Sequence, residues 1–254
     1  MTATDTTADE TRARVSTLDR ATADRLAATE YARFGDLLAG LDADQWRAPT
    51  VCPGWDVRAV AAHCLGMAVM IATTPEMVRQ NVKAAVRSKR RGTEFIDELT
   101  GLQVEERATM TPAQIAEAYR AVAPRAAASR AGAKNLTRRM TMDGGTGEGT
   151  WTMGYLWETI LTRDPWMHRV DIADAAGAEM TLSAEHDGVL VDDVVREWAA
   201  RHGRPFTLEL TGPAGGRWEV GTGGPALTDD ALEFCRRLSG RAPADGLLAT
   251  PVPF

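Results

Sequence analysis

The sequence of 254 residues contains few cysteines and no long apolar run. Its three cysteines, Cys52, Cys64 and Cys235, are odd in number and widely spaced, so they do not form a disulfide framework and fit a reducing cytoplasm. No apolar run approaches the roughly 20 residues that cross a bilayer, and the polar N-terminal residues contain no signal-peptide core. We therefore expect a cytoplasmic protein that does not bind membranes.

An excess of positive charge is also missing. The formal charge of -6 disfavours nucleic acid as a partner, because phosphate binding needs a basic surface. One local exception is RSKRRG at residues 87–92, which fits either a solvated helix end or an anion-binding cluster. The hydrophobic content of 44% is sufficient for the core of one large domain or two smaller ones.

Apolar residues that recur every three or four positions predict four long helices before residue 177. The predicted helices span about residues 11–41, 56–87, 111–132 and 152–176. Asp56 is the expected N-cap of the second helix, and Thr74-Pro75 is expected to interrupt it. Thr111-Pro112 is expected to start the third helix, and a glycine-rich loop, MDGGTGEGT, precedes the fourth.

The pattern changes after Gly177. Residues 183–202 predict a helix, and FTLELTG and GRWEVG predict two strands joined by a PAG turn. A further helix at DDALEFCRRLSG is expected to be capped by Thr228, and the last residues are expected to be extended. The sequence therefore predicts a mainly α protein, with a four-helix bundle in residues 1–177 followed by a small α+β domain in residues 178–254.

The segment RDPWMHRVDIADAAG, residues 163–177, places two ionisable side chains on an apolar helix face. On a helical wheel, Asp164 and His168 share an arc with residues expected in the core, Trp157, Leu161 and Ile172. Residues four apart are stacked neighbours, so the carboxylate and the imidazole can meet one atom between them. Burial without a partner costs roughly several kcal/mol, and a metal cation removes much of that cost.

His63, at the edge of the apolar stripe of the second helix, is the candidate third ligand. Facing helices of a bundle bring inward side chains to one point, so His63, Asp164 and His168 would supply two imidazoles and one carboxylate. This set with an open coordination position is typical of catalytic zinc, and iron or nickel would also accept it.

Other interpretations stay open for these positions. Asp164-Pro165 also fits an N-cap followed by proline at the first helical position, and His63 also fits a hydrogen-bonded, partly buried histidine. Cys64 fits a small core residue, and Cys52 fits an inert loop cysteine better than a ligand. Trp46 and Trp55 flank the loop before the second helix and are expected to pack, either in the core or over the pocket.

Two of these segments carry a family resemblance. WRAPTVCPGWDVRAVAAH, residues 46–63, contains a tryptophan, a Cys-Pro-Gly-Trp turn and a helix with a histidine. RDPWMHRVDIADAAG has an acid four residues before a histidine and an aspartate three residues after it. With LSGRAPADGLLATPVPF near the C-terminal end, they resemble the DinB-like, mycothiol-dependent maleylpyruvate isomerase family.

The resemblance implies a metal-binding four-helix bundle, a C-terminal α+β domain related to sterol-carrier folds, and zinc held by His63, Asp164 and His168. The chain departs from the family at Asp164, where glutamate is usual. Aspartate is one methylene shorter, so the metal sits closer to this helix or a water intervenes. The resemblance also implies that Arg241, in the pair Gly240-Arg241, faces the active site as a catalytic and cofactor-binding residue.

These implications give a functional hypothesis, a metal-dependent enzyme that uses mycothiol as thiol cofactor or cosubstrate. Its thiolate would add to a small electrophilic substrate. If the adduct rotates about the former double bond and then expels the thiol, the reaction is cis–trans isomerisation of the maleylpyruvate type. If the substrate retains the thiol, the reaction is S-transfer. Arg241 would hold a carboxylate or is a surface arginine, and Asp171 would orient His168 or form an ordinary salt bridge.

The alternative hypotheses are a non-catalytic DinB-like binding or regulatory module and a carrier of apolar ligands. Metal content separates the enzyme from the module, and co-purified lipid would indicate the carrier. The expected assembly is a monomer or a homodimer.

Overall fold

The computed structural model describes residues 13–145 and 147–254, and it confirms a mainly α protein with a small C-terminal α+β region. The chain divides into two compact units, one that ends at Ala178 and one that spans Glu179–Phe254.

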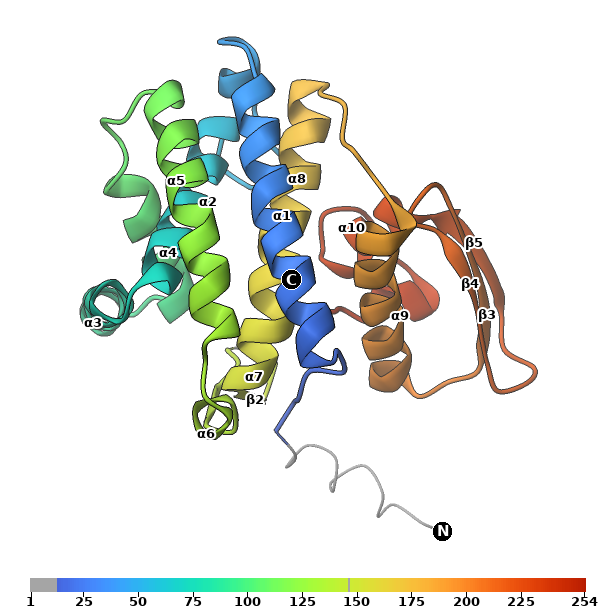
Figure 1. Ribbon diagram of the computed structural model, residues 1–254. Coiled ribbons are helices and arrows are strands. Elements are labelled where there is room, and N and C mark those ends of the chain that lie inside the picture. Colours follow the sequence, from blue (N-terminus) through green and yellow to red (C-terminus); the bar gives the residue numbers. More distant parts are fainter. Residues whose placement is uncertain (1–12, 146) are drawn as a thin grey trace. The chain divides into compact units, whose positions relative to one another are not determined.

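In the described part of the first unit, α1, α2, α5 and α8 form a four-helix bundle (Figure 1). Their bounds are α1 Arg20–Gly40, α2 Val57–Ala72, α5 Pro112–Ala131 and α8 Leu161–Ala176. α1 and α2 each pack against both α5 and α8. The interior is filled by buried apolar side chains, among them Phe34, Leu38, Val60, Leu65, Ile115, Tyr119 and Ile172.

The helix starts follow the capping residues of the sequence. Asp56 caps α2 by accepting the Ala59 backbone N–H at 2.8 Å, as predicted. Thr111 caps α5 in a capping box with Gln114, ahead of proline at the first helical position.

The first helix begins later than its apolar pattern predicts. α1 starts at Arg20, because the Asp19 carboxylate accepts a backbone N–H of the first turn and caps the helix. The predicted helix is therefore wrong for residues 13–19, and the first residues of the predicted span lie outside the described part of the chain. Arg14 instead forms a backbone bridge to β2 (Thr150–Thr152).

Two further helices, α3 (Thr74–Arg91) and α4 (Phe95–Glu105), pack against each other and against α2. The expected interruption at Thr74-Pro75 separates α2 from α3. α4 was not predicted, although Phe95, Leu99 and Leu102 fall at helical spacing, because the stretch is short and contains Gly101.

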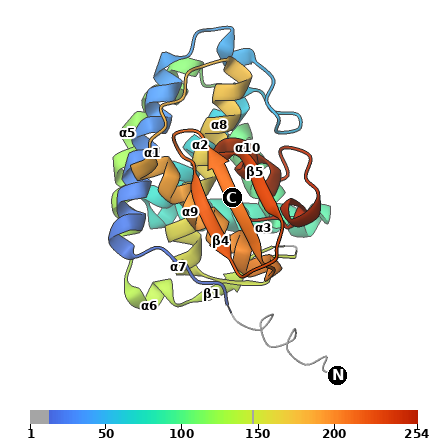
Figure 2. The ribbon, with the colours of Figure 1, turned by 90° about the vertical axis from the view of Figure 1, so that its right-hand side faces the viewer.

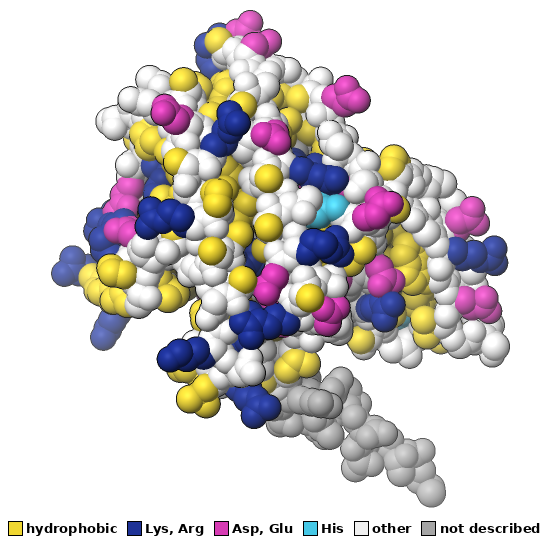
Figure 3. Space-filling model, viewed as in Figure 1, with side chains coloured by type: hydrophobic (Ala, Val, Ile, Leu, Met, Phe, Trp, Pro, Cys, Tyr) yellow, Lys and Arg dark blue, Asp and Glu magenta, His cyan; other side chains and the backbone are white. Residues whose placement is uncertain are grey.

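The basic cluster RSKRRG forms the last turn of α3. Two of its guanidinium groups form ion pairs with α4, Arg87 with Glu105 at 2.7 Å and Arg91 with Glu98 at 3.0 Å. Figure 3 shows dark blue and magenta side chains interspersed over the visible face. These contacts favour the interpretation as a helix end paired with acidic neighbours.

The predicted fourth helix consists of three contiguous pieces that follow a hairpin of β1 (Thr141–Asp143) and β2. They are α7 (Met153–Tyr155), a π-helical turn, η2 (Leu156–Ile160), and α8. Thr152 caps the first piece by accepting the Tyr155 N–H at 3.1 Å. The π-helical turn changes the register of the helix immediately before Asp164.

The second unit is a three-stranded sheet with helices on one face (Figures 1 and 2). Its elements are η3 Ala184–Gly188, α9 Val189–His202, β3 Phe206–Thr211, β4 Gly216–Val220, β5 Ala226–Asp230, α10 Ala231–Leu238 and η4 Gly246–Ala249. The central β3 pairs antiparallel with β4 and parallel with β5. The core centres on Trp198, whose ring lies 4.7 Å from Phe206 and 5.3 Å from Phe234.

Three local features of this unit differ from the prediction. The tail that was predicted to be extended begins with a 3₁₀ helix, η4 (Gly246–Ala249). β5 was not predicted, and Thr228, the predicted cap of the following helix, lies within that strand. Asp230 caps α10 instead, because its carboxylate accepts the backbone N–H groups of Leu232 and Glu233. Among residues 13–145 and 147–254, no helix combines the length and apolarity needed to cross a bilayer.

Candidate metal centre

His63 lies inside the bundle on α2, with 2% of its surface exposed. The helix is apolar on nearly every face, so the imidazole is surrounded by core side chains. Its Nδ1 lies 2.8 Å from Oε1 of Gln103, and the Trp55 ring lies 5.5 Å from the imidazole. A buried imidazole held at one nitrogen presents the other in a fixed direction.

Asp164 reaches the interior through the irregular start of α8. The helix begins at Leu161, so the interpretation of Asp164 as an N-cap before Pro165 is wrong. Pro165 has no N–H and leaves the carbonyl of Leu161, four residues earlier, without its helical donor. That carbonyl accepts the Tyr31 hydroxyl at 3.2 Å and the Arg130 guanidinium at 2.8 Å. Helices α1 and α5 thereby hold the turn that carries Asp164.

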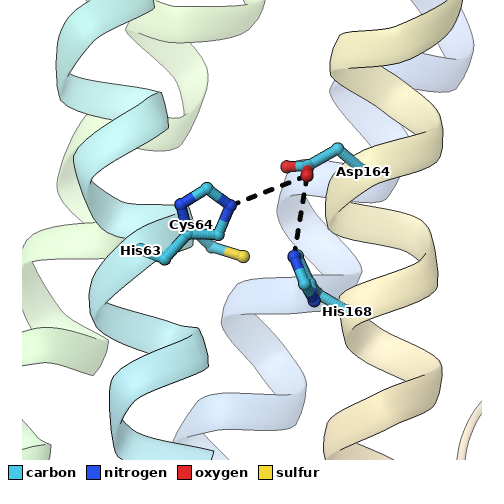
Figure 4. A group of neighbouring side chains, drawn as sticks. All are labelled: His63, Cys64, Asp164 and His168. Carbon is cyan, nitrogen blue, oxygen red and sulfur yellow. Dashed lines mark ion pairs between the residues drawn. The ribbon is translucent and has the colours of Figure 1, made fainter. Parts of the chain in front are cut away.

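The Asp164 carboxylate lies between two imidazoles (Figure 4). Its Oδ1 is 3.6 Å from Nε2 of His63 and 3.6 Å from Nε2 of His168. The two imidazole rings stand edge to face with their centroids 5.1 Å apart. The structure therefore brings together the three predicted ligands, from α2 and from α8.

These separations fit a divalent ion. Zinc bound to imidazole nitrogen and carboxylate oxygen at about 2.0–2.2 Å in tetrahedral geometry keeps its ligand atoms roughly 3.3–3.5 Å apart. The observed 3.6 Å separations are close to that value. Ligand atoms of His63, Cys64, Asp164 and His168 all lie within 4.8 Å of one another. Two imidazoles and a carboxylate leave at least one coordination position for a further ligand.

Cys64 lies next to these groups but differs from them chemically. Burial raises the pKa of its thiol well above the ordinary value, and the negative charges of Asp164 and Asp171 raise it further. Cys64 packs in the apolar core of the bundle, which fits its interpretation as a small core residue.

The second nitrogen of His168 is held by Asp171. Nδ1 of His168 lies 2.9 Å from Oδ2 of Asp171, whose side chain is fully buried. The Cys52 thiol donates to the same carboxylate oxygen at 3.5 Å. A carboxylate that accepts a hydrogen bond from the Nδ1–H group leaves the Nε2 lone pair free for an ion. Asp171 therefore occupies the position of an orienting residue for His168.

The tryptophans divide between core and site. Trp46 is buried in the core of the bundle, whereas Trp55 lies beside the His63 ring. Trp157 was predicted to be a core residue and is only half-buried. The prediction is wrong because the wheel assumed a regular helix, and the π-helical turn at Leu156–Ile160 rotates this residue out of the expected arc.

Sequence reasoning missed two buried amides next to this cluster, Gln103 on α4 and Gln80 on α3, both with 0% exposure. An amide is not a typical metal ligand, so no ligand pattern singles it out. The only sequence signal for a buried Gln80 is its position one helical turn before Ala84, which is buried on the inner face of α3. That signal is weak.

Arg241 follows α10 in the second unit, where its backbone N–H donates to the Arg236 carbonyl at 2.8 Å. Its predicted catalytic and cofactor-binding role stays a prediction.

The sequence model of the mycothiol maleylpyruvate isomerase N-terminal domain matches residues 27–173, more than half of the chain. The chain belongs to this family. The matched range includes all three candidate ligands of the bundle, and the predicted family is confirmed.

Two relatives with similar sequences are uncharacterised proteins from two strains of Mycobacterium tuberculosis. Each is 26% identical to this chain over 210 residues, which covers 78% of this chain and 77% of the relative. A crystal structure of the mycothiol-dependent maleylpyruvate isomerase is similar with a TM-score of 0.57 and 16% identity, covering 89% of this chain and 90% of that one. A mutant of that isomerase gives a TM-score of 0.53. At this identity the likeness shows a shared fold.

Proposed function

We propose that this member of the mycothiol maleylpyruvate isomerase family is a metal-dependent enzyme that uses mycothiol to attack a small electrophilic molecule. The observation that carries the proposal is the convergence of His63, Asp164 and His168 inside the bundle at separations that suit one divalent ion. Membership of the family and the name of the structurally similar isomerase support mycothiol as the thiol.

His63 and His168 would bind zinc through Nε2, and Asp164 would bind it through Oδ1. Bound there, the ion would supply Lewis-acid chemistry that favours the thiolate form of a coordinated thiol near neutral pH. The chain's own contribution is orientation, since Asp171 keeps the proton of His168 on Nδ1. The closely packed core around His63 excludes water from one side of the site.

The thiolate form of the thiol is the nucleophile. Its sulfur would form a bond to an electron-poor carbon of the substrate, and the displaced electron pair would be stabilised by the substrate's own carbonyl group. Rotation about the resulting single bond and expulsion of the thiol gives cis–trans isomerisation, whereas retention of the sulfur gives S-transfer. The same residues serve both reactions, and we propose that the Arg241 guanidinium holds a carboxylate of the substrate or of the thiol.

Metal content tests the first part of this proposal. The purified wild type is expected to hold close to one zinc per chain after exposure to zinc and gel filtration, and the His63→Ala, His168→Ala double variant is expected to hold almost none. Cys64→Ala is the matched control, since it changes a core neighbour of the cluster and is expected to keep the wild-type stoichiometry. Equal and negligible metal in the wild type and the double variant would refute the metal-dependent enzyme.

Product analysis tests the second part. The zinc-loaded protein is incubated with mycothiol and a panel of electrophiles that includes maleylpyruvate, and the products are analysed by mass spectrometry and NMR. A product of unchanged mass with altered double-bond geometry indicates isomerisation, and a mass increase by the thiol indicates transfer. Zinc binding with no turnover across the panel would instead favour a non-catalytic binding module.

A further inference from the structure

Gln103 and Gln80 form a hydrogen-bonded relay that ends at His63. Nδ1 of His63 lies 2.8 Å from Oε1 of Gln103, and Nε2 of Gln103 lies 3.0 Å from Oε1 of Gln80. Nε2 of Gln80 in turn lies 3.3 Å from the backbone carbonyl of Gly66 and 3.3 Å from the carboxylate of Glu76. The relay thus connects α2, α4 and α3 and returns to α2.

The far end of the relay determines the direction of every hydrogen bond in it. The Gly66 carbonyl and the Glu76 carboxylate only accept, so Gln80 must direct its amide N–H groups toward them. Its Oε1 is then the acceptor for the Gln103 N–H. Oε1 of Gln103 is consequently left facing His63, and an amide oxygen accepts hydrogen bonds but donates none.

The opposite orientation fails at both glutamines. If Gln103 alone were reversed, its Oε1 would face Oε1 of Gln80, two acceptors in contact. If both amides were reversed, Oε1 of Gln80 would face the Gly66 carbonyl and the Glu76 carboxylate. Both side chains are fully buried, where unpaired acceptors are costly, so the orientation described is strongly favoured.

Close packing keeps the relay in place. A Cβ at Gly66 would lie 2.4 Å from Cβ of Gln103, so only glycine lets α4 approach α2 at this point. The Arg107 guanidinium donates to the backbone carbonyl of Gln103 at 2.9 Å, and the Gln103 amide also contacts Sδ of Met67 at 3.2 Å. The amide therefore has no room to rotate away from His63.

We propose that Gln103, oriented by Gln80, is a positioning residue that keeps the proton of His63 on Nδ1 and presents the Nε2 lone pair toward Asp164. The effect on ion binding rests on the proposed function, but the position of the proton on His63 is a property of the metal-free chain. His63 and His168 are then prepared by two different second partners, a neutral amide for one and the Asp171 carboxylate for the other.

The direct test is NMR of the metal-free wild type labelled with ¹⁵N-histidine, at a pH where the imidazole is neutral. His63 is assigned by comparison with His63→Ala, and two-bond ¹H–¹⁵N correlations identify the protonated nitrogen. The expected result is a proton on Nδ1. A His63 that carries its proton on Nε2 would overturn the proposal without reference to any metal.

Variants then connect the relay to ion binding. Gln103→Leu removes the acceptor and is expected to shift His63 toward the Nε2 proton and to lower zinc affinity roughly 10- to 100-fold in a chelator competition. Gln103→Glu removes the N–H that faces Oε1 of Gln80, so it is expected to lower stability, but it keeps an acceptor beside His63 and is expected to retain the Nδ1 proton. Gln45→Leu is the matched control, because it removes a glutamine that bonds the Ala176 carbonyl instead, and it is expected to leave both readouts unchanged.

The outcomes separate this inference from the proposed function. An unchanged protonation site and zinc affinity in a folded Gln103→Leu would refute the relay while leaving the metal site intact. A wild type with the Nδ1 proton but no zinc binding would leave the relay standing and remove the proposed function. If Gln103→Leu does not fold, Gln103→Glu and the wild type decide, since loss of the Nδ1 proton in either contradicts the proposal.

Discussion

Asp164 keeps 20% of its side-chain surface exposed, while the imidazoles of His63 and His168 keep 3% and 9%. The carboxylate is therefore the member of the cluster that solvent reaches most easily. Behind it, Asp171 is fully buried and bonds Nδ1 of His168. At the scale of single residues, the cluster thus has an outer carboxylate that would meet an ion and an inner one that would orient a candidate ligand.

The inner carboxylate gives a residue-scale prediction. Asp171→Ala leaves Nδ1 of His168 without its partner, so zinc affinity is expected to fall roughly 10- to 100-fold, as for other residues that orient metal ligands. Asp174→Ala removes an exposed carboxylate from the same helix and is expected to leave the affinity unchanged. Competition with a chromogenic chelator measures both, and equal losses in the two variants would contradict an orienting role.

The sequence predicted the ligand candidates because helical spacing determines which side chains share a face. Asp164 and His168 are one turn apart, and His63 lies at the edge of an apolar stripe. Spacing within one helix does not predict which atoms of other helices a side chain meets. Gln103 was missed for that reason, and the N-cap interpretation of Asp164 failed because the structure compensates Pro165 from two other helices.

At the scale of elements, the start of α8 depends on donors from other helices. Arg130 lies in α5 and, besides the Leu161 carbonyl, bonds the Trp157 carbonyl and the Thr162 hydroxyl at 2.6 Å. Tyr31 adds its hydroxyl from α1. Apolar periodicity locates helices but is silent about such polar connections, so it did not predict the π-helical turn or the shift of Trp157.

Two buried tyrosines test this arrangement. Tyr31→Phe removes a hydrogen bond to the Leu161 carbonyl and is expected to lower the free energy of unfolding by about 1 kcal/mol. Tyr119→Phe is the matched control, because the Tyr119 hydroxyl is buried with no hydrogen-bond partner among the described residues. It is expected to be neutral or stabilising. Urea unfolding compares the two, and an equal loss in both would argue against the role of Tyr31.

The pairing of α3 with α4 gives a pH prediction. Hydrogen bonds from Arg79 and Lys83 lower the pKa of Glu106 from 4.5 to about 2. A lowered pKa in the folded state contributes stability that is present above pH 4.5 and is lost as the pH falls toward 2. The urea midpoints of the wild type and Glu106→Gln are therefore expected to differ most above pH 4.5 and to converge on acidification. Because these ion pairs of Glu106 are solvent-exposed, salt is expected to reduce the difference between the two midpoints. A difference that does not change with pH would contradict an origin in the Glu106 carboxylate.

At the scale of the whole molecule, the chain contains two compact units, and all three candidate ligands belong to the first. An ion that binds only the folded bundle stabilises it by mass action. At a free zinc concentration of 100 times the dissociation constant, the stabilisation of the bundle is expected to be about 2.7 kcal/mol. Thermal unfolding with and without zinc measures it, and a similar increase in the His63→Ala, His168→Ala variant would indicate binding elsewhere.

The Leu161 carbonyl, which lacks its helical donor because of Pro165, affects how quickly an ion can bind. Since donors from α1 and α5 already immobilise that turn, Asp164 and His168 have little conformational entropy left to lose when a cation arrives. We therefore expect the ps–ns backbone order parameters of α8, measured by amide ¹⁵N relaxation, to be nearly the same with and without zinc. Association would then be limited by the release of water from the incoming cation, because no segment of α8 has to order around it.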